Sequence, residues 1–168
     1  MKNLRILVLS LLAMFVTTVK AVFYEDLFYE IVDGEAIVFY QGGLDGRKSV
    51  VIPETVTWEG KTYKVTGICS RAFESHSLEE IKIGNNVRYI SDYAFYNCRK
   101  LKKVEIGNGV TEIGSHAFRD CSSLENVTMP DNVTAIGESV FRNCISLTSI
   151  TMPNNLTTIG EYAFYNCI

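Results

Sequence analysis

Apolar residues recur along residues 68–168 with a period of 23 residues. The largest is a phenylalanine that follows a small residue, and the successive phenylalanines are Phe73, Phe95, Phe118, Phe141 and Phe164. Three residues after each of the last four comes a cysteine, at Cys98, Cys121, Cys144 and Cys167. Self-similarity at such a period is typical of stacked repeats, so we expect the phenylalanines and the cysteines to form two structural columns.

Within one unit the pattern predicts a short strand, a bend and a compact turn. Leu101, Val104 and Ile106 end in apolar positions two residues apart, which is the period of a strand with one buried face. Gly114 permits a bend, and residues 115–118 fit one helical turn. We therefore predict a right-handed, β-dominant solenoid with one short strand and one helical turn in each 23-residue repeat.

Two hairpins are predicted ahead of the regular repeats. Apolar and polar residues alternate over 28–32 and 36–40 around Asp33-Gly34, a strong signal for a hairpin turn. A second hairpin is expected over residues 57–65, where the chain is longer than the usual repeat. Terminal repeats need a cover, and we expect these hairpins to provide it for the first repeat.

The first residues predict a secretory signal peptide. Lys2 and Arg5 precede an apolar run over residues 6–16, and small residues lead up to Ala21, where we place the cut. The alternative, a membrane anchor, needs roughly 20 apolar residues. The sequence therefore divides into a signal peptide (residues 1–21), an N-terminal β-hairpin cap (residues 22–48) and a repeat array (residues 49–168). The array stops in the middle of a repeat, which favours a segment of a longer array.

The repeat resembles that of the BspA-like leucine-rich repeat family, exported and surface proteins of bacteria and some parasitic protists. The matching motif runs from Ile68 to Cys167, and its Ala-Phe pair occurs five times, with Val140 replacing alanine once. The first unit departs from the motif in length and in carrying His76 at the cysteine position. The resemblance implies a leucine-rich-repeat solenoid with an extracellular, non-catalytic role in adhesion or protein interaction.

Charge argues against nucleic acid and anionic lipid as partners. The net charge of the 168-residue chain is −3, and loss of Lys2, Arg5 and Lys20 with the leader makes it −6. An acidic exported chain lacks the basic surface that such polyanions need. No apolar run after the leader is long enough to span a membrane. We therefore expect a secreted protein, extracellular or at the cell surface, with no transmembrane segment after signal cleavage.

The sequence contains no recognisable catalytic, cofactor or metal site. His76 and His116 are the only histidines, and neither Cys-x-x-Cys nor Gly-x-Ser-x-Gly occurs. A secreted hydrolase is therefore disfavoured, and we expect a protein that is not an enzyme and binds no cofactor. Four of the five cysteines fall in one column, which favours buried free thiols over disulfides or a zinc site. Cys69 lies outside this column and is predicted to be the reactive thiol.

The variable positions around each Ala-Phe pair form the candidate ligand surface. They are rich in tyrosine and arginine, which are frequent at binding hot spots. Stacking would align them in ridges along one side, and the candidates are Tyr93, Tyr96, His116, Arg119, Arg142, Tyr162 and Tyr165. The family resemblance implies that the ligand is a protein or glycan on the host matrix or a cell surface. Two alternatives stay open: these residues are ordinary packing residues, or the chain is a structural segment of a larger surface protein with no ligand of its own.

Overall fold

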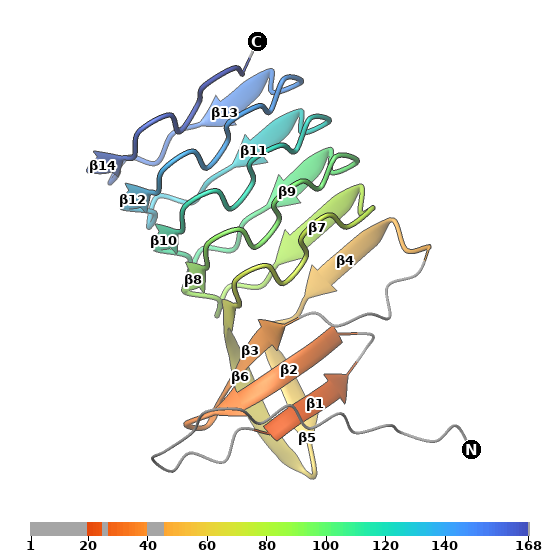
Figure 1. Ribbon diagram of the computed structural model, residues 1–168. Coiled ribbons are helices and arrows are strands. Elements are labelled where there is room, and N and C mark those ends of the chain that lie inside the picture. Colours follow the sequence, from red (N-terminus) through yellow and green to blue (C-terminus); the bar gives the residue numbers. More distant parts are fainter. Residues whose placement is uncertain (1–19, 25–26, 40–45, 168) are drawn as a thin grey trace, which may run out of the picture.

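The computed structural model describes residues 20–24, 27–39 and 46–167, and every regular element within them is a strand (Figure 1). The long sheet consists, in spatial order, of β1 (Lys20–Tyr24), β2 (Leu27–Val32), β3 (Glu35–Phe39), β6 (Lys61–Ile68), β8 (Tyr89–Ile90), β10 (Glu112–Ile113), β12 (Ala135–Ile136) and β14 (Thr158–Ile159), with β5 (Thr55–Trp58) beside β6. The short sheet consists of β13 (Ser149–Thr151), β11 (Asn126–Thr128), β9 (Lys103–Glu105), β7 (Glu80–Ile83) and β4 (Ser49–Ile52). Successive repeats are neighbours in both sheets, which confirms that the repeats stack.

The two predicted hairpins are present. β2 and β3 pair antiparallel through a turn at Asp33 (φ 50°) and Gly34 (φ 82°), and β5 and β6 pair through one at Glu59 (φ 48°) and Gly60 (φ 76°). Two successive residues with positive φ are typical of the tight hairpin turns whose twist matches that of the strands. β3 then pairs parallel with β6, and β6 with β8, so the hairpins extend the long sheet beyond the first regular repeat.

The predicted signal peptide lies outside the described residues, apart from its last two positions. Lys20 and Ala21 belong to β1, where they lie opposite Ile31 and Glu30 of β2. Cleavage after Ala21 would therefore leave β1 with residues 22–24. The leader and its cleavage stay predictions.

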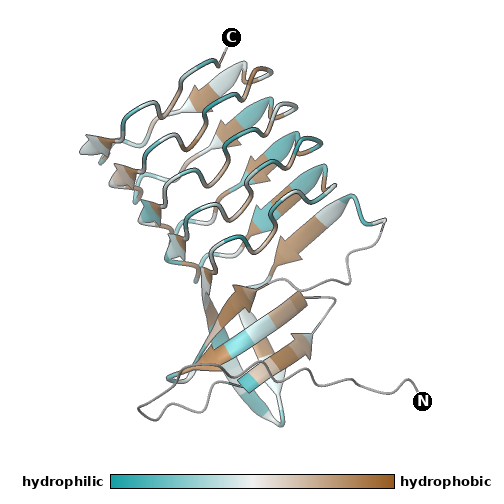
Figure 2. Ribbon diagram, in the orientation of Figure 1, coloured by the Kyte–Doolittle hydropathy of each residue, from teal (hydrophilic) through white to brown (hydrophobic). Residues whose placement is uncertain are grey.

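Each regular repeat contributes one strand to the short sheet, where the apolar spacing predicts it. The strands pair parallel in a register of one repeat, so that Val104 lies opposite Ile81 on one side and Val127 on the other. Val104 is buried, whereas Lys103 before it is exposed and Glu105 after it is half-buried. Figure 2 shows the apolar segments of successive strands in line with one another. The core therefore lies between the two sheets and consists of their inward-facing side chains.

Each repeat also contributes a two-residue strand to the long sheet, so the prediction of one strand per repeat is wrong. Ile90, Ile113 and Ile136 are parallel neighbours in β8, β10 and β12, and each side chain is buried. The apolar pattern shows that these residues turn inward but not that they pair. A segment of two residues is too short for the alternation that marks a strand, and its hydrogen-bond partners lie one repeat away.

The predicted helical turn at residues 115–118 is also wrong, because this segment is a series of tight turns. His116 has a φ of 58°, in the left-handed region that residues of a right-handed helix do not adopt. The N–H of Ala117 donates to the carbonyl of Gly114 (3.3 Å), whereas the N–H of His116 donates to Glu138 in the next repeat (2.8 Å). A helix would direct its N–H groups into its own segment and leave the repeats unjoined here. We call these segments the turn ladder: residues 69–76, 91–98, 114–121, 137–144 and 160–167.

Phenylalanine and cysteine form the two predicted columns. The centroids of successive phenylalanine rings are 5.0–5.6 Å apart and the rings lie within 12° of parallel. The thiol of Cys121 donates to the carbonyl of Phe95 (3.2 Å), and the same bond recurs at Cys98, Cys144 and Cys167. All five cysteines are free; Cys98, Cys121 and Cys144 are buried, whereas Cys69 and Cys167 are partly buried.

Gly109 is required by a close approach between two repeats. A Cβ atom here would lie 2.0 Å from the backbone oxygen of Asn85 and 2.8 Å from that of Val87. We expect Gly109→Ala to lower the free energy of unfolding by about 1–3 kcal/mol, because backbone rather than a flexible side chain must move. Urea unfolding followed by circular dichroism measures the loss. Asn108→Ala, at the exposed neighbour, is the control and should stay within about 0.5 kcal/mol of the parent chain; equal losses for the two variants would contradict this role of Gly109.

Candidate functional site

The turn ladder places the candidate side chains in two columns on one face of the stack. The first column consists of the left-handed residues at the third position of each turn segment, with φ of 54–59°: Arg71, Tyr93, His116, Ser139 and Tyr162. The second column lies three residues further along each segment: Glu74, Tyr96, Arg119, Arg142 and Tyr165. Backbone hydrogen bonds join each segment to the next, so equivalent side chains lie one above another.

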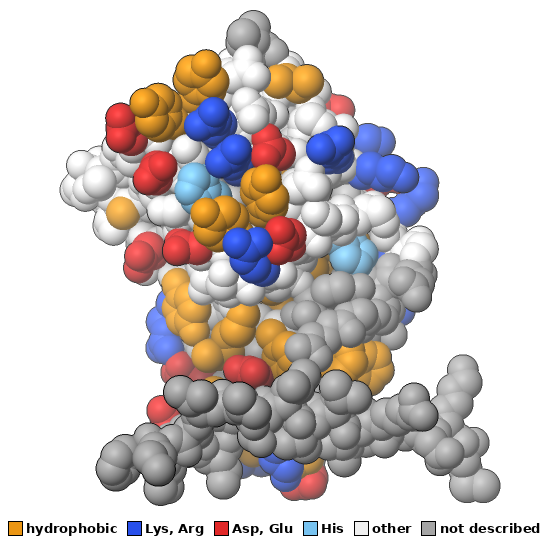
Figure 3. Space-filling model, viewed as in Figure 1, with side chains coloured by type: hydrophobic (Ala, Val, Ile, Leu, Met, Phe, Trp, Pro, Cys, Tyr) orange, Lys and Arg blue, Asp and Glu red, His pale blue; other side chains and the backbone are white. Residues whose placement is uncertain are grey.

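The seven predicted residues and Arg71 lie on one face of the stack, and we call this surface the aromatic–arginine ridge. Figure 3 shows apolar, basic and histidine side chains gathered over the turns on this face. Arg71 was not among the seven candidates, although the repeat spacing puts it in the first column. Arg71 stands two residues before Phe73, as Tyr93 stands two residues before Phe95, and this spacing identifies it as a member of the column.

In the repeats of the ridge that lie nearest the hairpins, Tyr93 makes the most contacts. The guanidinium of Arg71 lies 4.5 Å from the centroid of its ring, within the range of a cation–π interaction. The ring of His116 stacks on Tyr93 with centroids 4.7 Å apart, and Tyr96 meets it edge-on at 5.7 Å. Arg119 in turn lies 5.8 Å from the centroid of Tyr96. These five side chains therefore form one connected set of ring and cation–π contacts.

In the repeats nearer the C-terminus, packing of an arginine on tyrosine rings recurs around Arg142. Its guanidinium lies 5.0 Å from the ring centroid of Tyr165 and 5.8 Å from that of Tyr162. The two tyrosines meet edge-on with centroids 5.9 Å apart, and about half of each residue's surface is exposed. Arginine packed on tyrosine thus occurs in both halves of the ridge.

Several polar atoms on these rungs have no hydrogen-bond partner within the described residues. They include the Nε of Arg142, the Nδ1 of His116 and the Oγ of Ser139. Each is buried at the atomic level, and an unsatisfied buried polar atom costs about 1–3 kcal/mol. Ser139 is itself 1% exposed, so the first column has no exposed side chain between His116 and Tyr162. A ligand or water that reached these atoms would recover the hydrogen bonds that the protein leaves unmade.

The arginines of the ridge differ in how their charges are neutralised. Arg71 Nη1 lies 2.8 Å from Glu74 Oε2, and this hydrogen bond raises the pKa of Arg71 above its usual value. Arg119 Nε lies 3.4 Å from Asp120 Oδ2. Arg142 has no ion pair with an acidic side chain of the described chain. Its charge is therefore the one on this face that is most open to an external acceptor.

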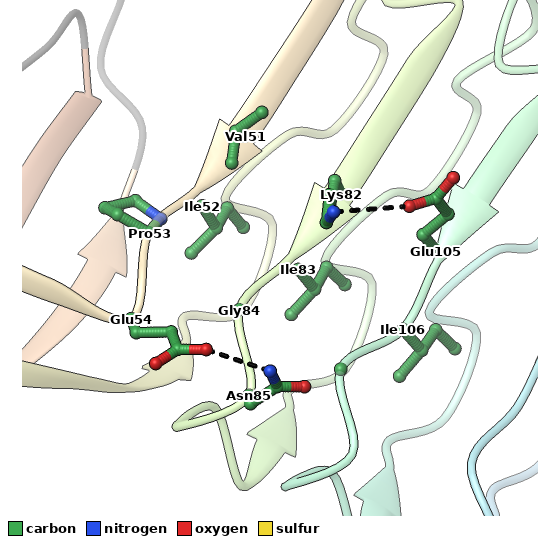
Figure 4. A pocket seen from close by; sticks show the side chains of 11 residues that line it. Val51, Ile52, Pro53, Glu54, Lys82, Ile83, Gly84, Asn85, Glu105 and Ile106 are labelled. Carbon is green, nitrogen blue, oxygen red and sulfur yellow. Dashed lines mark hydrogen bonds and ion pairs between the residues drawn. The ribbon is translucent and has the colours of Figure 1, made fainter.

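A concave feature separate from the ridge lies at the carboxyl ends of β4, β7 and β9 (Figure 4). This groove has a volume of about 370 Å³, and the sequence pattern contains no signal for it. Its polar side chains are already paired with one another: Lys82 Nζ lies 3.8 Å from Glu105 Oε2, and Asn85 Nδ2 donates to Glu54 Oε1 at 2.9 Å.

Cys69, which we predicted to be the reactive thiol, is protected. Its side chain packs against the buried core, and desolvation, with a smaller contribution from Glu30, raises its pKa to about 11. Because the thiolate is the nucleophile, this cysteine is a poor one at neutral pH. The sequence cannot show this, since the hairpin strands approach Cys69 only in the folded chain; its N–H bonds to the carbonyl of Val38 in β3 (2.8 Å).

The described residues contain no group of three or more histidine, cysteine or acidic side chains that could hold a metal ion. In the same part of the chain, no helix is long and apolar enough to cross a membrane. The chemistry that the ridge supports is recognition by aromatic faces, guanidinium groups and hydrogen bonds.

Two sheets in which the strands of the regular repeats pair parallel, a turn ladder and inward columns of phenylalanine and cysteine define a leucine-rich repeat fold. Residues 48–168 match the BspA type leucine rich repeat region in six copies, so the chain belongs to this family. The expected resemblance is thereby confirmed. A search of curated proteins found no match.

Several solved bacterial structures are similar to this chain. A leucine rich repeat protein of T. pallidum is 30% identical, with a TM-score of 0.73, over 89% of this chain and 64% of that one. A leucine-rich repeat protein from Bacteroides capillosus is 28% identical, with a TM-score of 0.62, over 84% and 98%. A leucine rich cell surface protein from Faecalibacterium prausnitzii is 25% identical, with a TM-score of 0.63, over 90% and 53%. The chain therefore spans less than two thirds of the T. pallidum and F. prausnitzii proteins.

Proposed function

We propose that this protein is an exported, non-catalytic adhesion module, a right-handed solenoid that presents the aromatic–arginine ridge to a protein or glycan of the host matrix or a cell surface. The observation that carries the proposal is Arg142, which packs on two half-exposed tyrosines with no acidic partner and an unsatisfied Nε. Arginine and tyrosine held in place before binding lose little entropy when a ligand arrives, which is typical of hot spots.

Two further observations support export and surface location. The first residues have the charge and apolar pattern of a secretory leader. One of the similar structures is described as a cell surface protein. Membership of a leucine-rich repeat family favours a role in protein interaction, which agrees with a ridge built from exposed aromatic and basic side chains.

The alternative is a structural segment of a larger surface protein with no ligand of its own. It is favoured by the coverage of the neighbours, because this chain spans 64% of the T. pallidum protein and 53% of the F. prausnitzii protein. In that case the ridge would be a packing surface, and substitution of its residues would change stability rather than binding.

Binding of the purified chain to immobilised matrix proteins, matrix glycans and whole cells separates the two functions. We expect saturable binding that Arg142→Ala weakens about tenfold or more, because the variant removes both the guanidinium and its contact with the tyrosines. Lys100→Ala removes the same charge from an exposed site outside the ridge and is the matched control. Absence of saturable binding by the folded chain, or equal affinities for the two variants, would rule out the ridge as an adhesive surface.

A further inference from the structure

Buried polar side-chain atoms without a hydrogen bond gather on two adjacent repeats of the ridge. Within the described residues they include His116 Nδ1 and Arg119 Nε on one repeat, and Ser139 Oγ and Arg142 Nε on the next. The two pairs occupy the same two columns, one repeat apart. Because buried polar atoms are normally hydrogen-bonded, several unsatisfied ones in one place favour a ligand that completes them.

The chemistry of these atoms defines what such a ligand must supply. Arginine Nε is a donor only, and a serine hydroxyl or an imidazole nitrogen can donate as well as accept. Arg119 Nε lies 3.4 Å from Asp120 Oδ2 without a hydrogen bond, and Arg142 has no ion pair with an acidic side chain of the described residues. The ligand must therefore present acceptor oxygens, and the planar guanidinium matches those of a carboxylate.

The ring faces of the inner ridge are already occupied. Arg71 and His116, from the repeats on either side, lie 4.5 Å and 4.7 Å from the ring centroid of Tyr93. Arg119 lies over Tyr96 at 5.8 Å. A sugar ring packs on an open aromatic face, whereas these repeats offer N–H donors and positive charge. This arrangement favours a protein ligand over a glycan.

We propose that these two repeats bind the carboxylate of a single aspartate or glutamate in a protein ligand. Arg142 is the main anchor, and Ser139, His116 and Arg119 donate around it. Adjacent repeats are about 4.8 Å apart, so one carboxylate can accept hydrogen bonds from both. The Nε of Arg142 and the hydroxyl of Ser139 are buried in the free chain, so a small rotation of the Arg142 side chain accompanies binding, as is common at interfaces.

The inference rests on the adhesive function proposed above and specifies the chemistry of its ligand. One acidic residue flanked by uncharged residues fits this site better than a run of acids. The chain has a net negative charge, which repels a polyanion as a whole, while the two arginines attract one carboxylate locally.

Titration of the purified, nitrogen-15-labelled chain with short capped peptides tests the proposal by nuclear magnetic resonance. One peptide has a central glutamate among serine, glycine and tyrosine, and its match has glutamine there. We expect the glutamate peptide to shift the Nε–H signals of Arg119 and Arg142 saturably, with an affinity about tenfold or more above that of the glutamine peptide. Glucuronic acid and N-acetylneuraminic acid carry the carboxylate on a sugar and should bind about tenfold more weakly than the glutamate peptide.

Three variants separate the hydrogen-bonding fork from simple charge. Arg142→Lys keeps the charge but removes the Nε–H, and it should weaken binding of the glutamate peptide about tenfold. Arg99→Lys makes the same change at an exposed arginine outside the ridge and should leave binding unchanged. Ser139→Ala should weaken binding several-fold without lowering the urea midpoint, because its hydroxyl makes no hydrogen bond in the free chain.

Equal binding of the two peptides, equal weakening by Arg99→Lys, or a sugar acid that binds as tightly as the glutamate peptide would overturn the proposal. Failure of the adhesive function has a different signature. Saturable binding to matrix proteins or cells that the glutamate peptide does not compete for would leave adhesion in place and remove the carboxylate as its ligand.

Discussion

Replacement of Phe118 by alanine is expected to lower the free energy of unfolding by about 3–5 kcal/mol, as other buried phenylalanine truncations do. The Phe118 ring is fully buried and stacks between Phe95 at 5.0 Å and Phe141 at 5.6 Å, both within 3° of parallel. A repeat cannot collapse around the lost ring, because backbone hydrogen bonds of the turn ladder hold its neighbours at one-repeat spacing. Urea-induced unfolding followed by fluorescence and circular dichroism measures the change.

Phe164→Ala is the matched control for this experiment. Phe164 has the same sequence environment but is only partly buried and stacks on one ring, that of Phe141 at 5.5 Å. Its truncation removes fewer contacts and opens a smaller cavity, so a smaller loss is expected. An unfolding midpoint for Phe118→Ala equal to that of the parent chain would contradict the stacked core.

Stability is also expected to fall steeply as the pH rises above about 8.5, the ordinary thiol pKa. Burial raises the pKa of Cys121 and Cys144 in the folded chain and sets that of Cys69 at about 11. Between the unfolded and folded pKa values, the unfolded thiol has lost its proton and the folded thiol has kept it, so rising pH favours unfolding. Each such thiol contributes about 1.4 kcal/mol per pH unit, or about 4 kcal/mol per pH unit for the three together.

Denaturant unfolding under reducing conditions at a series of pH values from 7 to 10 measures this slope. Cys144→Ala removes one of the buried thiols, and its slope above pH 8.5 should be shallower by about 1.4 kcal/mol per pH unit, whatever its stability at neutral pH. Below the ordinary thiol pKa, the thiols are protonated in both states and the two slopes should agree. An identical alkaline slope in the variant would show that the buried thiols do not govern this stability.

The repeat makes the core of this protein predictable from sequence. A residue type that returns every 23 positions returns to the same environment, so the spacing alone places Phe118 and Cys121 in buried columns. The hairpin turn at Asp33-Gly34 is equally predictable from sequence, because a local backbone preference determines it.

The errors all concern hydrogen bonds between repeats or contacts between distant segments. Residues 115–118 fit a helical turn by their composition, yet His116 is left-handed because its N–H is used by the next repeat. Cys69 was expected to be reactive, and packing against the hairpin strands protects it. Neither partner is close in sequence, so local propensity contains no information about them.

The columns of the candidate surface follow from the repeat alone, because Tyr93 and His116 occupy one repeat position and Arg119 and Arg142 another. The contacts of those side chains depend on the folded chain: Arg142 lies over two tyrosines without an acidic partner, whereas Arg71 is paired with Glu74. The physical reason is that periodicity specifies an environment, while charge pairing and ring contacts depend on distances between neighbouring rungs that arise only when the repeats stack.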